Sequence, residues 1–235
     1  MYCLCNFVGN NRKLNAGILT SPIFITGIGT GIGKTIAAAI VAEALQADYW
    51  KPVQAGYEDG TDSNFIRQSL SNASSVVYPE LYKLKMAVSP HIAAREENTT
   101  INLSDIKNRL TAINTDPQFK RNGIVIEGAG GLMVPLNDRE FVADLIKQLQ
   151  AKVVLVSRNY LGSINHSLLT AEVCRLYKLD VLGWIFNDQY LAYEDEIVHW
   201  SGFPKIGSIP FSDNPDKEFI KGQATLIADA LKKII

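Results

Sequence analysis

The sequence predicts an α/β fold in which a doubly wound, mostly parallel sheet carries helices on both faces. Apolar runs of strand length alternate along the chain with segments whose apolar residues recur at helical spacing. Most of these runs are continuous rather than interrupted by polar residues, as in strands that are buried on both faces of a parallel sheet. The repeated order of strand and helix therefore indicates right-handed crossovers within one layered domain.

The expected elements follow one another along the chain. Strands are expected at residues 23–26, 49–53, 124–127, 153–157, 182–187 and 206–209. Helices are expected between them at residues 35–46, 141–150, 167–177 and 219–233. The less regular stretch from 57 to 122 is expected to hold helices near 62–70, 90–96 and 104–114. Because ligands of such sheets bind at the carboxyl ends of the strands, the residues that follow each strand are the candidates for function.

Composition and charge narrow the classes of function. The chain has 235 residues, of which 47% are hydrophobic and 20% charged, as in one soluble domain, which we expect at residues 21–235. The 23 basic and 24 acidic residues nearly balance, which argues against nucleic-acid binding and against an anionic membrane surface. We find no apolar run as long as a membrane span and no signal-peptide core near the N-terminus, so we expect a cytoplasmic protein. Residues 1–20 are expected to form a poorly ordered extension.

Three cysteines carry little information about function. Cys3, Cys5 and Cys174 give an odd count, and Cys3 and Cys5 lack the spacing of a zinc site or a redox pair. We interpret them as incidental, with metal binding as the alternative.

A glycine-rich segment follows the first expected strand. Residues 27–35 read Gly-Ile-Gly-Thr-Gly-Ile-Gly-Lys-Thr and lead into an alanine-rich helix. Glycines let backbone N–H groups turn inward around an anion, the helix points its positive end at the same place, and Lys34 and Thr35 complete a nucleotide-phosphate site of the P-loop NTPase type. Five residues separate Gly27 from Gly33, one more than in the G-x-x-x-x-G-K-[ST] motif. A glycine-rich turn without a ligand is the alternative, but it leaves Lys34 and Thr35 unexplained.

Three further polar residues are expected at the same rim of the sheet. Lys51 lies in an apolar stretch, where its charge is costly unless an anion such as phosphate offsets it. A salt bridge or a surface lysine with a buried stem explains Lys51 as well. Glu127 directly follows an apolar run and opens a Gly-Ala-Gly-Gly segment, which suits metal coordination beside a ligand. Asp62 is a second candidate carboxylate, although it also fits a helix N-cap, and with Thr35 these oxygens would suit Mg²⁺.

Motifs spread over the chain after residue 20 occur in an order and at spacings typical of one enzyme family. They are Thr26-Gly27 through Gly33-Lys34-Thr35, Lys51-Pro52-Val53 with Gly56, Asp62, Ser89-Pro90-His91, Glu127-Gly128-Ala129-Gly130-Gly131, Gly162 with Ile164-Asn165-His166, Gly183-Trp184 with Asn187-Asp188, and Ile209-Pro210. In this combination the chain resembles dethiobiotin synthetase, the ATP-dependent ring-closing enzyme of biotin synthesis. The longer phosphate loop is also a feature of that family.

The resemblance implies a ligase whose substrates are ATP, CO2 and diaminopelargonic acid and whose metal is Mg²⁺. It implies Lys51 and Lys34 as catalytic residues, and Thr35, Asp62 and Glu127 around the metal. Further ATP-binding positions are implied at Gly31, Ile32, Gly33, Ile36, Gly128, Ala129, Gly130, Asn187, Asp188, Pro210, Phe211, Ser212 and Asp216. Substrate-binding positions are implied at Thr30, Lys51, Ala55, Gly162, Ile164 and Asn165. Members of the family are homodimers, and the segment from Gly162 to Asn165 resembles the part that the partner subunit contributes.

Three positions depart from the family pattern. Gly29 and Gly31 stand where the family often has acidic residues, and Ala55 stands where it usually has a small hydroxyl residue. We expect Ala55 to weaken substrate binding, since the loss of one neutral hydrogen bond costs about 1 kcal/mol. A non-catalytic nucleotide-binding homologue therefore stays an alternative. A partitioning-type ATPase on the same fold would need a second lysine early in the loop, where Ile28, Gly29 and Thr30 stand.

Overall fold

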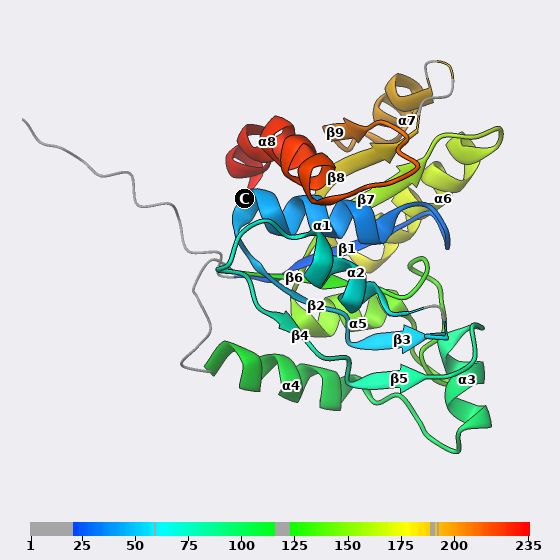
Figure 1. Ribbon diagram of the computed structural model, residues 1–235. Helices are drawn as coiled ribbons and strands as arrows, with labels where there is room; N and C mark the ends of the chain where they lie inside the picture. Colours follow the sequence, from blue (N-terminus) through cyan, green and yellow to red (C-terminus); the bar gives the residue numbers. More distant parts are fainter. Residues whose placement is uncertain (1–20, 59, 116–122, 189–190, 192) are drawn as a thin grey trace, which may run out of the picture.

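The computed structural model describes residues 21–58, 60–115, 123–188, 191 and 193–235, and the predicted extension at 1–20 lies outside these ranges. Within them, seven strands form one sheet in the order β4-β2-β6-β1-β7-β8-β9, and every adjacent pair is parallel (Figure 1). The strands are β1 (Ile23–Gly27), β2 (Asp48–Trp50), β4 (Val77–Tyr78), β6 (Ile124–Glu127), β7 (Lys152–Arg158), β8 (Asp180–Asn187) and β9 (Lys205–Ile209). The predicted α/β fold with a parallel sheet is confirmed.

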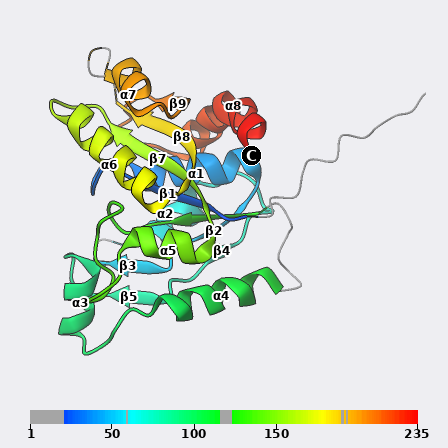
Figure 2. The same ribbon diagram turned by 180° about the vertical axis from the view of Figure 1, so that it is seen from behind.

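Helices cover both faces of the sheet (Figures 1 and 2). Side chains on β1 show the division, because Ile23 and Ile25 pack into one core cluster and Phe24 packs into the other. The helices on the face of Ile23 and Ile25 are α1 (Lys34–Leu45), α2 (Asp62–Ser69) and α8 (Lys217–Ile234). The helices that pack into the cluster of Phe24 are α3 (Pro90–Glu96), α4 (Leu103–Thr115), α5 (Val142–Leu149), α6 (Ser163–Tyr177) and α7 (Tyr193–Ser201).

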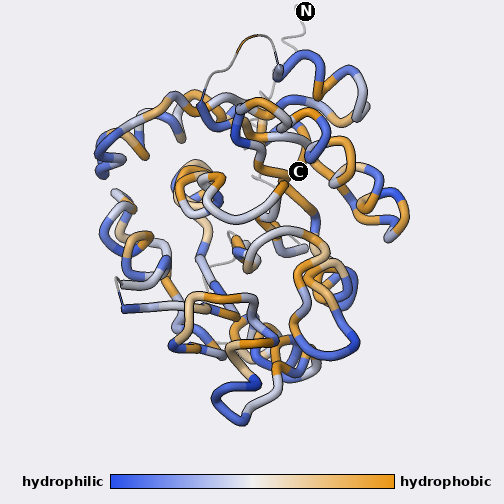
Figure 3. Tube along the Cα trace, turned by 90° about the vertical axis from the view of Figure 1, so that its right-hand side faces the viewer, coloured by the Kyte–Doolittle hydropathy of each residue, from blue (hydrophilic) through white to orange (hydrophobic). Residues whose placement is uncertain are grey.

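Helix α1 is buried on nearly every side. Its residues from Ala37 to Ala42 are all buried, and four of these six are alanines, which let the helix lie close to the sheet and to its neighbouring helices. Several other helices bury one side only, for example α5 and α8, and hydrophobic and hydrophilic stretches alternate along the chain (Figure 3). In the described ranges, no helix combines the length and the apolar character needed to cross a membrane.

The single strand predicted at residues 49–53 is wrong. Strand β2 ends at Trp50, and the chain leaves the large sheet at Lys51 and Pro52. Proline lacks an N–H group and cannot continue a hydrogen-bonded ladder in the sheet interior. After Pro52 the chain forms β3 (Val53–Ala55), which pairs in parallel with β5 (Tyr82–Leu84) in a second, two-stranded sheet. Lys51 therefore lies between two strands of different sheets rather than at the end of one.

Other differences concern short or weakly patterned elements. The sequence did not predict the strands β4 and β5 or the helix α7, and α6 begins at Ser163, before the predicted residue 167. The three helices predicted between residues 57 and 122 are confirmed as α2, α3 and α4.

Candidate nucleotide-binding and catalytic site

The phosphate loop joins β1 to the N-terminus of α1 at the carboxyl edge of the large sheet. Gly33 has a φ of +84°, and a Cβ there would lie 2.4 Å from Nδ2 of Asn187, so glycine alone fits this position. At the other end of the loop, a Cβ on Gly27 would lie 2.1 Å from the carbonyl oxygen of Val156. The backbone N–H of Ile28 donates to that same oxygen at 3.1 Å. The loop is thus held against β7 and β8, and the first turn of α1 opens toward the site that it encloses.

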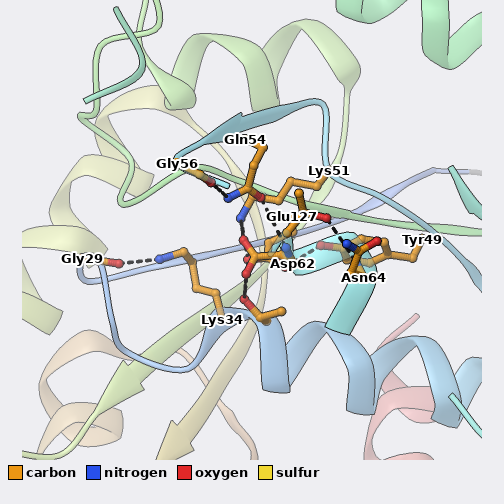
Figure 4. A network of polar contacts seen from close by, with 11 residues as sticks. Gly29, Lys34, Tyr49, Lys51, Gln54, Gly56, Asp62, Asn64 and Glu127 are labelled. Atoms are coloured by element: carbon orange, nitrogen blue, oxygen red, sulfur yellow. Dashed lines mark hydrogen bonds and ion pairs between the residues drawn. The ribbon is translucent and has the colours of Figure 1, made fainter. Parts of the chain in front are cut away.

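Lys34 is the first residue of α1, and its side chain turns back over the loop (Figure 4). Its Nζ donates to the carbonyl oxygen of Gly29 at 2.6 Å, and the residue is only 7% exposed. Burial lowers the pKa of Lys34 from 10.5 to about 8, although the charge of Glu127 acts in the opposite direction. An anion bound in the loop would supply the opposite charge that this buried ammonium lacks.

Two carboxylates, a hydroxyl and a second lysine meet beside the loop (Figure 4). Thr35 Oγ1 lies 3.0 Å from Asp62 Oδ1 and 3.0 Å from Glu127 Oε1. Lys51 forms ion pairs with both carboxylates, at 3.0 Å from Glu127 Oε1. Tyr49 donates its hydroxyl hydrogen to Glu127 Oε2 at 2.7 Å, so both oxygens of this buried carboxylate are engaged.

The charges in this cluster depend on one another. Burial alone would lower the pKa of Lys51, but the negative charges of Glu127 and Asp62 outweigh burial and raise it. Burial, together with the charge of Glu127, raises the pKa of Tyr49 well above its ordinary value, so its hydroxyl stays a donor. Lys51 is therefore a permanent cation at the centre of the cluster.

The oxygen atoms of this cluster fit the ligand preference of Mg²⁺. A threonine hydroxyl has one hydrogen to donate, yet Thr35 Oγ1 faces carboxylate oxygens of both Asp62 and Glu127 at hydrogen-bond distance. Three hard oxygen donors that converge in this way suit a divalent cation, whose remaining positions water and phosphate oxygens would fill. The part of the chain that the structure describes has no cluster of three or more His, Cys, Asp or Glu side chains that offers a richer protein site.

Two cavities meet at the phosphate loop. The larger, of about 610 Å³, is lined by predicted site residues and by others with no predicted role. The predicted ones are Thr30, Gly31, Gly33, Lys34, Thr35, Lys51, Ala55, Asp62, Glu127, Ala129 and Gly130. The smaller, of about 170 Å³, lies on the other side of the loop. Its predicted members are Gly31, Ile32, Gly33, Ile36, Asn187, Asp188, Pro210, Phe211 and Ser212.

A few predicted site residues lie outside both linings. Gly128 is buried beneath the site, where a Cβ would lie 2.6 Å from the ring of Phe24. Asp216 caps α8, because its carboxylate accepts from the backbone N–H of Phe219 at 2.9 Å. The segment from Gly162 to Asn165 forms the N-terminal end of α6.

The N-cap interpretation of Asp62 is wrong. Thr61 caps α2 by accepting from the backbone N–H of Asn64 at 3.2 Å, and Asp62 is the first helical residue. The capping role is filled by its neighbour, so the Asp62 carboxylate is free to face Lys51 and Thr35.

Sequence reasoning missed several residues that line the cavities. Gln54 contributes to the larger cavity, and its Oε1 accepts from the backbone N–H of Asp62 at 3.4 Å. Arg158 and Phe219 line the smaller cavity. Arg158 ends β7, so the rule that ligands bind at the carboxyl ends of strands would have found it. The remaining ones are Ala87, Val88 and Val134 in the larger cavity. Ser89 and Pro90 in the larger cavity and Ile209 in the smaller belong to the motifs but had no predicted site role.

Solved structures similar to this chain share its fold. One is the MinC:MinD cell division protein complex of Aquifex aeolicus, with a TM-score of 0.56 and 16% identity over 91% of this chain and 94% of that chain. Another is the cell division ATPase MinD of Pyrococcus furiosus, with a TM-score of 0.55 and 13% identity over 92% of this chain and 100% of that chain. Identities this low support the P-loop NTPase-like fold and nothing about the reaction.

Relatives found by sequence similarity identify the family of the chain. A protein-family model described as an AAA domain matches residues 21–218. The "ATP-dependent dethiobiotin synthetase BioD" of Cytophaga hutchinsonii is 45% identical over 207 residues, which cover 88% of this chain and 96% of the relative. The protein of the same name from Christiangramia forsetii is 43% identical over 202 residues, which cover 86% of this chain and 93% of the relative. The chain therefore belongs to the dethiobiotin synthetase family.

Proposed function

We propose that this chain catalyses the ATP-dependent carboxylation and ring closure of diaminopelargonic acid to dethiobiotin. One observation carries the proposal. Two buried lysines, Lys34 and Lys51, flank converging oxygens of Thr35, Asp62 and Glu127 in a single cavity beside the phosphate loop. A reaction that moves a phosphoryl group between two anions needs this kind of positioned positive charge.

The proposed reaction proceeds through a carbamate and then through the mixed anhydride of that carbamate with phosphate. One amine nitrogen of the diamine bonds to CO2 and loses a proton, which gives a carbamate. A carbamate oxygen then bonds to the γ-phosphorus of ATP while the bond to the bridging oxygen of ADP breaks. The second amine attacks the carbamoyl carbon, phosphate leaves with the bonding electrons, and the attacking nitrogen loses a proton to complete the cyclic urea.

The two lysines have separable roles in this proposal. The side chain of Lys34 turns back over the loop, where its ammonium would bind the nucleotide phosphates. Lys51 projects from the β2–β3 connection into the same cavity and stays protonated, so it would neutralise charge on the carbamate oxygen and the transferred phosphoryl group. The protein supplies position and charge, with no covalent intermediate on its own side chains.

The carboxylates would hold the metal ion. Thr35, Asp62 and Glu127 would bind Mg²⁺, which when bound neutralises negative charge on the nucleotide phosphates. Tyr49 fixes the orientation of Glu127 by its hydrogen bond to Oε2, and Gln54 accepts from the backbone of Asp62.

The diamine would occupy the larger cavity, where Thr30 and Ala55 form part of the wall. Gly162, Ile164 and Asn165 lie outside that wall within one subunit, so we propose that they act on the substrate of a partner subunit in a homodimer. We further propose that the enzyme works in the cytoplasm.

The direct test is phosphate release that depends on the diamine. Purified protein would be incubated with ATP, Mg²⁺, bicarbonate and diaminopelargonic acid, and phosphate and dethiobiotin would be measured together. We expect equal amounts of both products and no phosphate above background without the diamine. A matched variant, Arg95→Met, removes an exposed ion pair with Asp138 and should keep full activity. ATP hydrolysis at the same rate with and without the diamine would rule out the proposed reaction.

A further inference from the structure

The smaller cavity contains an ion pair between Asp188, a predicted site residue, and Arg158, which belongs to none of the predicted motifs. Arg158 ends β7, and its Nε donates to Oδ2 of Asp188 at 2.5 Å. Both residues line the cavity together with Asn187, Pro210 and Phe211. Among the lining residues that the structure describes, Arg158 and Asp188 carry the charges. The guanidinium side chain is 48% exposed and the carboxylate side chain 20% exposed, so a bound ligand can reach both.

The backbone of Asp188 is fixed on two sides. It has a φ of +59°, and its N–H donates to the carbonyl oxygen of Ile209 at 3.1 Å. Its carbonyl oxygen accepts from Nδ2 of the buried Asn159 at 2.9 Å. Asn159 also donates its backbone N–H to the carbonyl oxygen of Asn187 at 3.0 Å. The carboxylate of Asp188 is therefore presented to the cavity from a rigid turn.

The side-chain amide of Asn187, the residue before Asp188, is hydrogen-bonded to the phosphate loop. Nδ2 of Asn187 donates to the carbonyl oxygen of Ile32 at 2.6 Å, and Asn187 is 7% exposed. That bond uses one of the two Nδ2 hydrogens, so the other hydrogen and the side-chain oxygen of this uncharged group remain. The net charge of the cavity lining therefore depends on Arg158 and on whether the Asp188 carboxylate is free or paired.

A free carboxylate and a paired one prefer different purines. Guanine presents two neighbouring donors, its N1–H and its 2-amino group, which match the two oxygens of one carboxylate. Adenine presents one donor, its 6-amino group, next to an acceptor, N1, whose lone pair a carboxylate repels. A guanidinium on the carboxylate cancels its charge and adds N–H donors, which suit the acceptor nitrogens of adenine.

We propose that Arg158 sets the base preference of the nucleotide site, favouring adenine over guanine by pairing with Asp188. This inference rests on the proposed function only in that the smaller cavity receives the base of the nucleotide whose phosphates lie in the loop. Arg158 is a specificity residue here, because it acts on which nucleotide binds and does not touch the reacting atoms.

The test compares the binding of two nucleotides by titration calorimetry. ADP and GDP, each with Mg²⁺, would be titrated into the wild-type protein, Arg158→Met, and the double variant Arg158→Met with Asp188→Asn. We expect the wild type to bind ADP more tightly. Arg158→Met should move the ratio of the two Kd values toward GDP by at least about tenfold, as for a lost charge-assisted pair in a partly buried site. The double variant should lose most of that shift, since the exposed carboxylate is gone.

Two controls keep the outcome unambiguous. Arg95→Met removes another arginine from an ion pair, with Asp138, and should leave both Kd values unchanged. Arg158→Gln provides a second neutral side chain if the methionine variant does not fold. An unchanged Kd ratio in the neutral Arg158 variants, or a shift that persists in the double variant, overturns the inference.

The proposed reaction fails in a different way. If the wild type binds neither nucleotide, the proposed function and this inference both fall. If the Kd ratio shifts as expected while phosphate release stays independent of the diamine, only the proposed reaction falls.

Discussion

The Nζ of Lys51 lies 3.0 Å from Oε1 of Glu127, and both side chains are almost completely buried. The same carboxylate oxygen lies 3.0 Å from Thr35 Oγ1. Lys51, which we propose neutralises charge in the transition state, is thus paired with Glu127, which we propose is also a ligand of the metal ion. A buried cation and a divalent metal near the same carboxylates compete for them, and this competition makes the site testable without turnover.

The first prediction concerns stability in the absence of nucleotide. Lys51→Met leaves Asp62 and Glu127 without their cation, so we expect the free energy of unfolding to fall by roughly 3 kcal/mol in EDTA. For a chain of this size that lowers Tm by on the order of 10 °C. Millimolar Mg²⁺ should restore much of the loss in the variant and change the wild type far less. Thermal unfolding followed by circular dichroism measures this, and an equal Mg²⁺ effect on both proteins would contradict the shared site.

The second prediction separates binding from chemistry. Lys51→Ala should lower diamine-dependent phosphate release by at least roughly a hundredfold, because transition-state charge is no longer neutralised. The Kd for ADP should stay within about threefold of the wild type, since Lys34 and the loop still hold the phosphates. Steady-state kinetics and calorimetry on the same preparation give both values. Unchanged turnover would remove Lys51 from the mechanism.

The third prediction tests the residue that orients Glu127. Tyr49→Phe removes the hydroxyl that donates to Glu127 Oε2 at 2.7 Å and leaves the ring in the core. Because groups that orient metal ligands typically contribute ten- to a hundredfold to affinity, we expect the Mg²⁺ concentration needed for half-maximal activity to rise by about tenfold. Activity at saturating Mg²⁺ should largely recover. A variant that differs from the wild type only in Tm would make Tyr49 purely structural.

The fourth prediction uses two glycines of the same loop as a matched pair. Gly33→Ala forces a left-handed backbone on alanine and places its Cβ 2.4 Å from Asn187 Nδ2, so ADP affinity should fall by at least about tenfold. Gly29→Ala meets no atom within 4 Å and should change the Kd for ADP by less than about twofold. If both variants bind ADP equally well, the loop is not the phosphate site.

The fifth prediction concerns the pH dependence of a thiol. Burial raises the pKa of Cys174 from 9.0 to about 12, so almost no thiolate forms at pH 8. In a variant with Cys3→Ser and Cys5→Ser, Ellman's reagent should modify Cys174 only after denaturation. Because the folded state holds this proton more tightly, its contribution to stability is present below pH 9 and is lost as pH rises from about 9 to about 12. Rapid modification of the native protein at pH 8 would contradict the burial of this side chain.

Much of the geometry of the candidate site could be predicted from sequence, because one rule about parallel sheets brings distant residues together. Lys34 and Thr35 follow β1, and Glu127 is the last residue of β6, its neighbour in the sheet, so their convergence follows from strand order. The sequence placed Lys51 near Asp62 and Glu127 and allowed a salt bridge, but it did not specify that Lys51 pairs with both carboxylates. That pairing depends on the switch of the chain between two sheets at Pro52, and the sequence reads as one strand there.

The missed elements have weak patterns for physical reasons. Strands β4 and β5 have two and three residues, too few to show a period. Helix α7 buries only Ile197 and Ser201, so it lacks an apolar stripe. The pairing of Arg158 with Asp188 depends on the left-handed turn at Asp188, which sequence patterns do not specify.

Helix α1 ties the phosphate loop to the centre of the hydrophobic core. With Ala37 to Ala42 buried, the helix that follows the loop cannot unfold without disrupting the core. Any nucleotide that binds the native loop therefore stabilises the whole domain by mass action. We therefore expect bound nucleotide to slow proteolysis of the whole domain, in addition to serving as a substrate.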